Sequence, residues 1–208
     1  MKVFSKNQLQ RYPIYLKYFK ELAEDGITEI SSPKIASVLG YSEEQIRKDL
    51  QAISTEPGRP KKGRNVAKLI ETIESFLGYR DSVNAVLIGC GHLGSALLNY
   101  PNFEDMGLSI VAGFDLSPNK VGRDIGGKHI YHIDQFADVY PTLNAAIVVI
   151  CVPADKAQDA LDLAVSKGAR AIWNFAPCHL KAPTGVVVET VNLASSLAVL
   201  SHRLNNKR

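Results

Sequence analysis

The feature that most constrains the fold is a glycine-rich turn in the segment VLIGCGHLGSAL, where Gly89, Gly91 and Gly94 form the pattern G-x-G-x-x-G. An apolar stretch typical of a buried strand precedes the turn, and a stretch typical of a helix follows it. In this setting the first glycine permits a tight turn, the second lets backbone approach a pyrophosphate, and the third lets helix and strand pack closely. Free N–H groups at the helix start would face the phosphates. The segment therefore predicts the start of a dinucleotide-binding βαβ unit.

The second predicted strand ends in GFDLS and places Asp115 21 residues after Gly94. An acidic side chain at this position hydrogen-bonds the ribose hydroxyls of an adenosine. The next residue is Leu116 rather than a cation, which disfavours a 2′-phosphate and predicts NAD(H) in preference to NADP(H). Lys120 and Arg123 follow, and we expect them near the adenine end of the nucleotide or in solvent.

Further nucleotide contacts are expected from the turn itself and from the carboxyl ends of later strands, where ligands bind in open α/β sheets. These residues are Cys90, His92, Leu93, Leu116, Lys120, Val152, Pro153, Asn174 and Ala176. His92 has two interpretations, a contact to the pyrophosphate or nicotinamide and an exposed loop residue. Phe175 and Pro177 fit a nicotinamide wall and ordinary packing equally well.

Strand and helix patterns alternate from residue 83 onward, which predicts an α/β domain whose parallel sheet is covered by helices on both faces. The expected strands are VNAVLIG, LSIVAGFD, GKHIYHI, NAAIVVICV and ARAIWNFA, and the expected helices are HLGSALLNY, DQFADVY and ADKAQDALDLAVSKG. A last helix is predicted from Val188 onward. Its stripe of Leu193, Leu197 and Leu200 could dock on a second subunit.

The first 80 residues carry a different pattern, in which three helices precede a basic loop and a fourth follows it over residues 66–77. The first helix is expected to carry Ile14, Tyr18 and Leu22 on one stripe, with Pro13 near its start. A tight turn separates the second helix, which Ser32 is expected to cap, from the third. Short helices joined in this way are typical of a helix-turn-helix.

The third helix has the features of a DNA-recognition helix. Ser42 and Gln45 form a capping-box pattern at its start. Ile46, Leu50 and Ile53 lie on a core-facing stripe. The residues left on the outer face are Glu44, Gln45, Arg47 and Lys48. A recognition helix contacts base edges from its N-terminal half and phosphates through Arg and Lys, so DNA contact is predicted for Ser42, Gln45, Arg47 and Lys48.

A basic loop, EPGRPKKGRN, follows this helix in the position of the wing of a winged helix. Its cations are Arg59, Lys61, Lys62 and Arg64. Pro60 biases Arg59 toward an extended backbone, which suits insertion into a narrow A·T-rich minor groove. Residues 1–80 hold 14 Lys and Arg against 10 Asp and Glu, whereas residues 81–208 hold 10 against 11. We therefore expect DNA contact from the loop, and the alternative is a flexible basic linker.

Other functional classes are disfavoured. The chain has no run of 18 apolar residues and its N-terminus lacks the apolar core of a signal peptide, so a cytoplasmic location without a membrane partner is expected. Its three cysteines form no C-x-x-C pair, which argues against zinc and against a disulfide framework. The obvious catalytic candidates are His92, Cys90, Cys178 and His179, and none has a partner in a recognisable arrangement. We expect no catalytic site, and thiol sensing by Cys90 or Cys178 remains an alternative.

Together the motifs QIRKDL, GCGHLGSAL, GFD, VPADKAQ, NFAP and VETVNLASSL resemble the Rex family of redox-sensing transcriptional repressors over nearly the whole chain. The resemblance implies a homodimer that binds operator DNA through a winged helix and NAD(H) through a Rossmann domain, with the C-terminal helix swapped into the partner subunit. It implies that NADH releases DNA whereas NAD⁺ permits binding. The family's DNA contacts fall on Arg47 and Lys48 and its nucleotide contacts on Gly89, Gly91, Gly94 and Asp115. Tyr100 is implied to lie near the nicotinamide and the swapped helix.

The chain departs from the family pattern in the wing, ISTEPGRPKKGRN, and at three single positions. Asn192 stands where an acidic residue is usual, His92 where Arg or Asn is frequent, and Lys17 where an arginine is expected to pair with that acid. The expected domains are residues 1–80, 81–189 and 190–208. The alternatives are a small NAD-dependent dehydrogenase with a helical cap, a CoA-binding regulator and an architectural DNA-binding protein.

Overall fold

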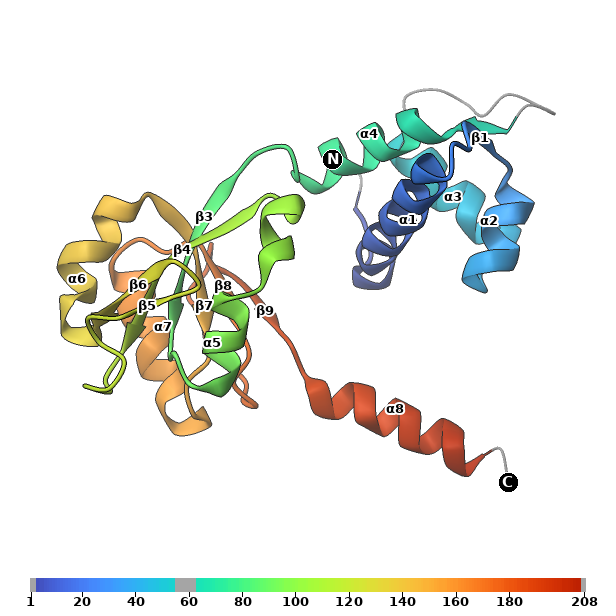
Figure 1. The fold of residues 1–208 in the computed structure, drawn as a ribbon. Coiled ribbons are helices and arrows are strands. Elements are labelled where there is room, and N and C mark those ends of the chain that lie inside the picture. Colours follow the sequence, from blue (N-terminus) through green and yellow to red (C-terminus); the bar gives the residue numbers. More distant parts are fainter. Residues whose placement is uncertain (1–2, 55–62, 207–208) are drawn as a thin grey trace. The chain divides into compact units, whose positions relative to one another are not determined.

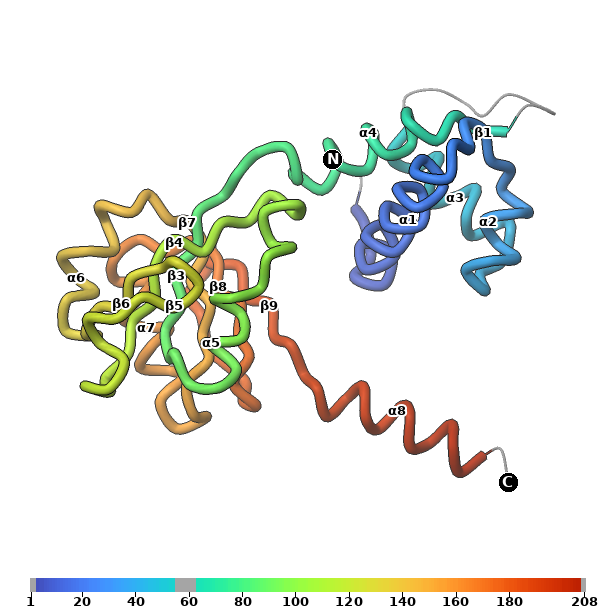
Figure 2. The backbone as a smooth tube through the Cα atoms, viewed as in Figure 1, coloured from blue at the N-terminus to red at the C-terminus, as the bar shows by residue number. Residues whose placement is uncertain are grey.

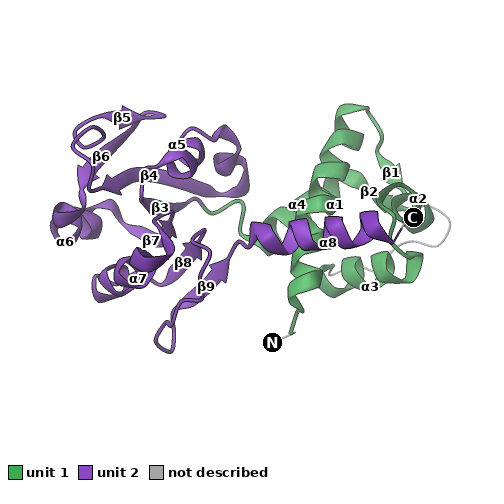
Figure 3. Cartoon of the chain, turned by 90° about the horizontal axis from the view of Figure 1, so that it is seen from below, with its two compact units in different colours: residues 1–81 green, residues 82–208 purple. Residues whose placement is uncertain are grey.

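The computed structural model describes residues 3–54 and 63–206, so the predicted DNA contacts Arg59, Lys61 and Lys62 lie outside the described residues. The chain divides into two compact units, residues 1–81 and residues 82–208 (Figure 3). Buried apolar side chains form a separate core in each unit.

Unit 1 is a helix-turn-helix with a two-stranded ribbon (Figures 1 and 2). Its helices are α1 (Lys6–Glu24), α2 (Ser32–Leu39), α3 (Glu43–Ile53) and α4 (Val66–Leu77). Strand β1 (Glu29–Ile30) pairs antiparallel with β2 (Arg64–Asn65), and neither strand was predicted. A Cβ on Gly63 would lie 2.8 Å from the carbonyl oxygen of Ile30, so glycine at this position lets the chain enter β2 close to β1. The ribbon gives unit 1 the architecture of a winged helix.

Capping residues set the helix boundaries of unit 1 largely as predicted. The Ser42 hydroxyl accepts the N–H of Gln45 at 3.2 Å at the start of α3. Gly40 ends α2 and Gly78 ends α4 in the left-handed conformation that glycine adopts without strain. Helix α2 begins one residue earlier than expected, because Ser31 rather than Ser32 is its cap.

Helix α1 differs from its prediction in two respects. Ser5 caps it by accepting the N–H of Gln8 at 3.2 Å, so the helix begins early and Pro13 falls in its interior rather than near its start. The expected stripe was wrong at Ile14, which is 44 % exposed, whereas Leu22 is buried and Tyr18 packs against the core as expected. The buried residues of α1 are Tyr12, Tyr15, Leu16, Phe19 and Leu22. Aromatic rings therefore dominate this core, and the Tyr12 ring lies 5.0 Å from that of Phe76 on α4.

Unit 2 is an α/β domain built on a seven-stranded sheet with the order β5-β6-β4-β3-β7-β8-β9 (Figures 1 and 2). The strands are β3 (Val83–Ile88), β4 (Leu108–Asp115), β5 (Asp124–Ile125), β6 (Lys128–His132), β7 (Ala145–Ile150), β8 (Ala171–Asn174) and β9 (Val187–Thr190). All neighbouring pairs are parallel except β5–β6. Omitting β5, this is the strand order of a Rossmann fold, and the order reverses between β3 and β7. Ligands bind at this reversal, beyond the carboxyl ends of the strands.

Alternate residues of the central strand β3 pack into two apolar layers, one on each face of the sheet, as expected for a sheet covered on both faces. Val86 and Ile88 pack in one layer with residues of α6 (Phe136–Val139) and α7 (Ala157–Ser166). Ala85 and Leu87 pack in the other with Leu98 of α5 and Phe103. The remaining helices of the unit are α5 (His92–Leu98), the 3-10 helices η1 (Pro101–Met106), η2 (Ile133–Gln135), η3 (Tyr140–Leu143) and η4 (Ala154–Lys156), and α8 (Leu193–Asn205).

The C-terminal segment corrects the prediction of one helix from Val188 onward. Its first part is the edge strand β9, because a run of β-branched residues favours a strand. Helix α8 begins at Leu193, where the side-chain oxygen of Asn192 accepts the N–H of Ser195 at 3.1 Å. No residue of α8 is buried by the described part of the chain. None of the described helices combines the length and apolar character needed to cross a membrane.

Candidate nucleotide and DNA sites

The glycine turn lies at the carboxyl end of β3, and two of its glycines are required by close backbone contacts. Gly89 has φ 95°, and a Cβ there would lie 2.8 Å from the carbonyl group of Cys151 at the end of β7. A Cβ on Gly94 would overlap the carbonyl oxygen of Gly89, so this glycine lets α5 pack against the turn. Gly91 is different, because a Cβ there meets no described atom within 4 Å. The space beside Gly91 is what a pyrophosphate approaching the backbone needs.

Hydrogen bonds hold the backbone of Cys90 at both its N–H and its carbonyl oxygen. Its N–H donates to the carboxylate of Asp115 at 2.6 Å. Its carbonyl oxygen accepts from the Ser95 hydroxyl at 2.8 Å and from the ammonium group of Lys120. The other oxygen of Asp115 accepts the N–H of Ser117 at 2.8 Å. Because a carboxylate has about four lone-pair sites, Asp115 can hold the turn and still accept from ribose hydroxyls.

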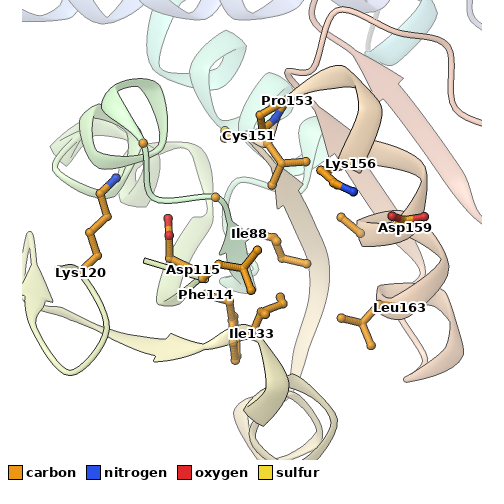
Figure 4. A pocket seen from close by; sticks show the side chains of 15 residues that line it. Ile88, Phe114, Asp115, Lys120, Ile133, Cys151, Pro153, Lys156, Asp159 and Leu163 are labelled. Carbon is orange, nitrogen blue, oxygen red and sulfur yellow. The ribbon is translucent and has the colours of Figure 1, made fainter. Parts of the chain in front are cut away.

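A cavity of about 460 Å³ opens beside this turn, at the reversal of strand order (Figure 4). Seven residues that were predicted to contact the nucleotide line this cavity, namely Gly89, Gly91, Asp115, Leu116, Lys120, Val152 and Pro153. The residues that sequence reasoning missed are Ile88, Phe114, Ile133, Cys151, Lys156, Asp159, Ala160 and Leu163. Asp115 and Lys120 lie across the cavity from Lys156 and Asp159 in Figure 4. The last four missed residues follow the spacing i, i+3, i+4, i+7, and this helical face was the available signal for them.

The remaining predicted contacts lie outside this cavity. His92, Leu93 and Tyr100 are exposed at the two ends of α5, whereas Cys90, Gly94, Asn174 and Ala176 are buried. The Tyr100 ring makes an edge contact with Phe103 at 4.8 Å. The side-chain amide of Asn174 donates to the carbonyl oxygens of Ala176 and Cys178 and accepts the N–H of Ala176 at 2.9 Å. Asn174 therefore shapes the turn after β8 with its own hydrogen bonds.

The cysteines at the site have raised pKa values. Burial, as the largest cause, raises the pKa of the Cys90 thiol to about 12, and the charge of Asp115 acts in the same direction. Burial raises the pKa of Cys151 to about 12 as well. Because the thiolate is the nucleophile, protonated thiols of this kind are unreactive at neutral pH.

Two of the predicted DNA-binding residues of α3, Arg47 and Lys48, lie on its solvent face, and Gln45 is half-buried. Arg47 is 3.8 Å from the carboxylate of Glu43, and Lys48 is 2.7 Å from that of Glu44. The Lys48 ammonium lowers the pKa of Glu44, but exposed pairs of this kind are weak and release their cations readily. Ser42 serves as the helix cap. Arg64, at the base of the loop, is half-buried, and this burial lowers its pKa.

Beneath that face, α3 is joined to α1 by a buried ion pair that sequence reasoning missed. Asp49 is 3 % exposed, and its two carboxylate oxygens accept from Arg11 at 2.6 and 2.8 Å. The Tyr15 hydroxyl donates to the same carboxylate at 2.8 Å, and the Tyr12 hydroxyl donates to the backbone carbonyl of Asp49 at 2.9 Å. The motif QIRKDL gave no sign of it, because the three partners of Asp49 lie 34 to 38 residues before it in the chain.

Each unit matches a known family model. A model described as "Putative DNA-binding protein N-terminus" matches residues 4–51, and one described as "CoA binding domain" matches residues 80–178. The "Redox-sensing transcriptional repressor Rex" of Caldicellulosiruptor bescii is 37 % identical over 199 residues, 96 % of this chain and 91 % of that protein. The Rex of Bacteroides thetaiotaomicron is 39 % identical over 197 residues, 95 % of this chain and 89 % of that protein. The chain belongs to the Rex family.

Solved Rex structures match the whole chain. The crystal structure of RSP, a Rex-family repressor, has a TM-score of 0.89 at 33 % identity and covers 100 % of this chain and 96 % of that one. The structure of RSP in complex with β-NAD⁺ and operator DNA has a TM-score of 0.91 at the same identity, covering 100 % and 95 %. The predicted resemblance to Rex and the predicted α/β fold with a DNA-binding N-terminal unit are thereby confirmed.

Proposed function

We propose that the chain is a transcriptional repressor that senses the NADH/NAD⁺ ratio. It binds operator DNA when its nucleotide site is empty or holds NAD⁺, and NADH releases it. The observation that carries the proposal is the cavity beside the glycine turn, in a chain whose other unit exposes Arg47 and Lys48 on a recognition helix. Crystal structures of RSP in complex with β-NAD⁺ and operator DNA and in complex with β-NADH support it.

The cavity fits a dinucleotide by the character of its walls. The open space at Gly91 leaves backbone N–H groups accessible to a pyrophosphate, and the Asp115 carboxylate borders the cavity where ribose hydroxyls would donate. Apolar side chains of Ile133 and Leu163 line the part that an adenine ring would fill. His92, Leu93, Asn174, Ala176 and Tyr100 are proposed for the nicotinamide side.

NAD(H) is preferred over NADP(H) and CoA because of the charges at the end of β4. A phosphate on the adenosine ribose would face the Asp115 carboxylate. Lys120 borders the same wall, but its ammonium group donates to the Cys90 carbonyl. CoA also carries a ribose phosphate, and the family model that matches residues 80–178 is described as "CoA binding domain". CoA is therefore the first competitor to test.

Operator DNA is proposed to bind the outer face of α3 and the wing. Gln45, Arg47 and Lys48 would enter the major groove, with Ser42 at the helix start beside a phosphate. Arg64 and the loop cations Arg59, Lys61 and Lys62 would contact the flanking minor groove. A ligand of this kind makes the cytoplasm the proposed site of action.

A homodimer is proposed, with α8 swapped onto the partner subunit. Leu193, Leu197 and Leu200 are 63–70 % exposed, and an apolar stripe of this size on one helix is typical of a protein interface. The chain is proposed to be a regulator and not an enzyme, because the relatives that match 95–96 % of its length are described as transcriptional repressors.

The decisive experiment measures DNA and nucleotide binding together. Fluorescence anisotropy with a duplex selected from random sequence by the chain itself would be recorded at one salt concentration, with NAD⁺, NADH, NADPH and CoA compared. Of the four nucleotides, only NADH should release the duplex. NADH should weaken operator binding by about 5- to 150-fold, which corresponds to a coupling of about 1–3 kcal/mol. Operator DNA should weaken NADH binding by the same factor. Equal NADH affinities with and without DNA would refute the proposal, and release by CoA alone would favour the CoA regulator.

A further inference from the structure

The buried pair between Arg11 and Asp49 connects the two helices of unit 1 that a recognition surface needs to hold together. Asp49 follows Arg47 and Lys48 directly on α3 but points into the unit, where it is 3 % exposed. Arg11 contributes two nitrogens, Nε at 2.6 Å and Nη2 at 2.8 Å, to the two oxygens of the carboxylate. A two-pronged contact of this kind fixes orientation as well as distance.

The contact extends one turn along α3. In the orientation of the Gln45 amide that satisfies both of its polar atoms, the amide oxygen accepts from Arg11 Nη1 at 3.1 Å and from Nε at 3.3 Å. Gln45 and Asp49 are i and i+4 on the same helix, so Arg11 is fixed to two successive turns of α3. Because Arg11 holds the oxygen of Gln45, it also sets the direction of the NH₂ group, which is the donor end of this side chain.

Stability alone does not account for this polar arrangement. A buried ion pair adds little to stability when compared with apolar side chains of similar volume, because desolvation offsets the attraction between the charges. Tyr15 donates to the same carboxylate at 2.8 Å and Tyr12 to the Asp49 carbonyl at 2.9 Å, so three neighbouring side chains of α1 bond to one residue of α3. What these directional bonds fix is the rotation of α3 about its own axis.

We infer that Arg11 and Asp49 are positioning residues for DNA recognition, which fix the rotation of α3 and the donor end of Gln45 toward the bases. The inference rests on the proposed DNA binding. The pair itself does not contact a base or a phosphate. It acts by setting the direction in which Gln45, Arg47 and Lys48 point.

The double substitution Arg11→Met with Asp49→Leu tests the inference, because it replaces the pair by apolar side chains and leaves no buried charge alone. The measured quantity is the ratio of affinities for a selected operator and for a scrambled duplex. We expect that ratio to fall at least about 10-fold, while binding to the scrambled duplex and to NADH stays within about twofold of the wild type. The matched control is Lys20→Met with Glu74→Leu, which removes the ion pair at 2.8 Å between α1 and α4 and should leave the ratio unchanged.

A folded Arg11→Met, Asp49→Leu variant with the wild-type ratio would overturn the inference and leave the pair a purely structural one. If that variant does not fold, Arg11→Lys decides by the same criterion, because lysine keeps the charge and loses the two-pronged geometry. The affinity ratio of the wild type tests the proposed DNA recognition by itself. If the wild-type chain binds operator and scrambled duplex equally well, both the proposed recognition and the inference are refuted. If the wild type prefers the operator and only the variant loses that preference, both are supported.

Discussion

Asp115, at the end of β4, accepts the N–H of Cys90 at 2.6 Å and thereby ties the glycine turn after β3 to the neighbouring strand. The residue proposed to bind ribose is thus also the residue that holds the turn in shape. The two roles are linked, because a nucleotide that displaced the turn would have to break this short hydrogen bond.

Replacement of Asp115 by Ala should weaken NADH and NAD⁺ alike. Loss of a charge-assisted hydrogen bond is worth about 1.5–3 kcal/mol, which corresponds to about 10- to 150-fold in affinity. Titration calorimetry would measure both nucleotides. Asp138→Ala, at an exposed acidic position of α6, is the control and should bind as the wild type does. Unchanged affinity in Asp115→Ala would remove this residue from the site.

Alanine at Gly94 should destabilise the fold, whereas alanine at Gly91 should not. The Cβ at Gly94 would overlap the Gly89 carbonyl oxygen, so Gly94→Ala should lower the melting temperature and abolish NADH binding. The Cβ at Gly91 enters open space, so Gly91→Ala should melt as the wild type does and still bind NADH at least about 10-fold more weakly. Tight NADH binding by Gly91→Ala would place the pyrophosphate elsewhere.

Arg47→Ala should weaken operator binding without changing the melting temperature, because Arg47 lies on the surface and pairs only loosely with Glu43 at 3.8 Å. Loss of one phosphate contact should reduce the slope of log affinity against log salt by about 1, whereas loss of a base contact should cost about 1–3 kcal/mol and relax sequence preference. Lys167→Ala, an exposed cation of unit 2, is the control. Equal loss in both variants would point to general charge rather than to α3.

Leu197→Asp combined with Leu200→Asp should convert the proposed dimer into a monomer. Both side chains are more than 60 % exposed on α8 in the single chain, and a carboxylate would be desolvated in an apolar interface. Light scattering after size exclusion gives the mass. Because α8 contributes nothing buried to the described chain, the variant should remain folded, and a mass that stays twice that of the chain would contradict a role for this stripe.

The thiols of Cys90 and Cys151 should react slowly with iodoacetamide at pH 8. The pKa of Cys90 is raised from its ordinary 9.0 to about 12, so the thiolate fraction is small and the rate should be at least about 100-fold below that of the unfolded chain. The same shift means that the folded state holds these protons more tightly than the unfolded state. Their contribution to the free energy of unfolding is therefore complete below about pH 9 and decreases as pH rises toward 12. Mass spectrometry identifies the modified residue, and fast alkylation of Cys90 would revive thiol sensing.

Local signals account for the parts of the fold that were predictable. Ser42, Gly40 and Gly78 act within a few residues of their own positions, and the helix over residues 66–77 was predicted to the residue. The glycine turn was predictable because strand, turn and helix are adjacent in the chain.

The features that were missed depend on distant partners or on competing local patterns. The Arg11–Asp49 pair joins residues 38 apart, and the pocket face of α7 became apparent only when the sheet order placed it opposite Asp115. The stripe of α1 was wrong at Ile14, because the helix faces the core with Tyr12 and Tyr15 instead.

Only Val191 and Asn192 separate the edge strand β9 from α8, and each of them makes a hydrogen bond. Val191 donates its N–H to the Asn174 carbonyl at 2.8 Å, and Asn192 caps the helix. No further residue separates the strand from the helix. A change in the direction of α8 would therefore act on the hydrogen bond between Val191 and Asn174, and through it on the turn that Asn174 shapes.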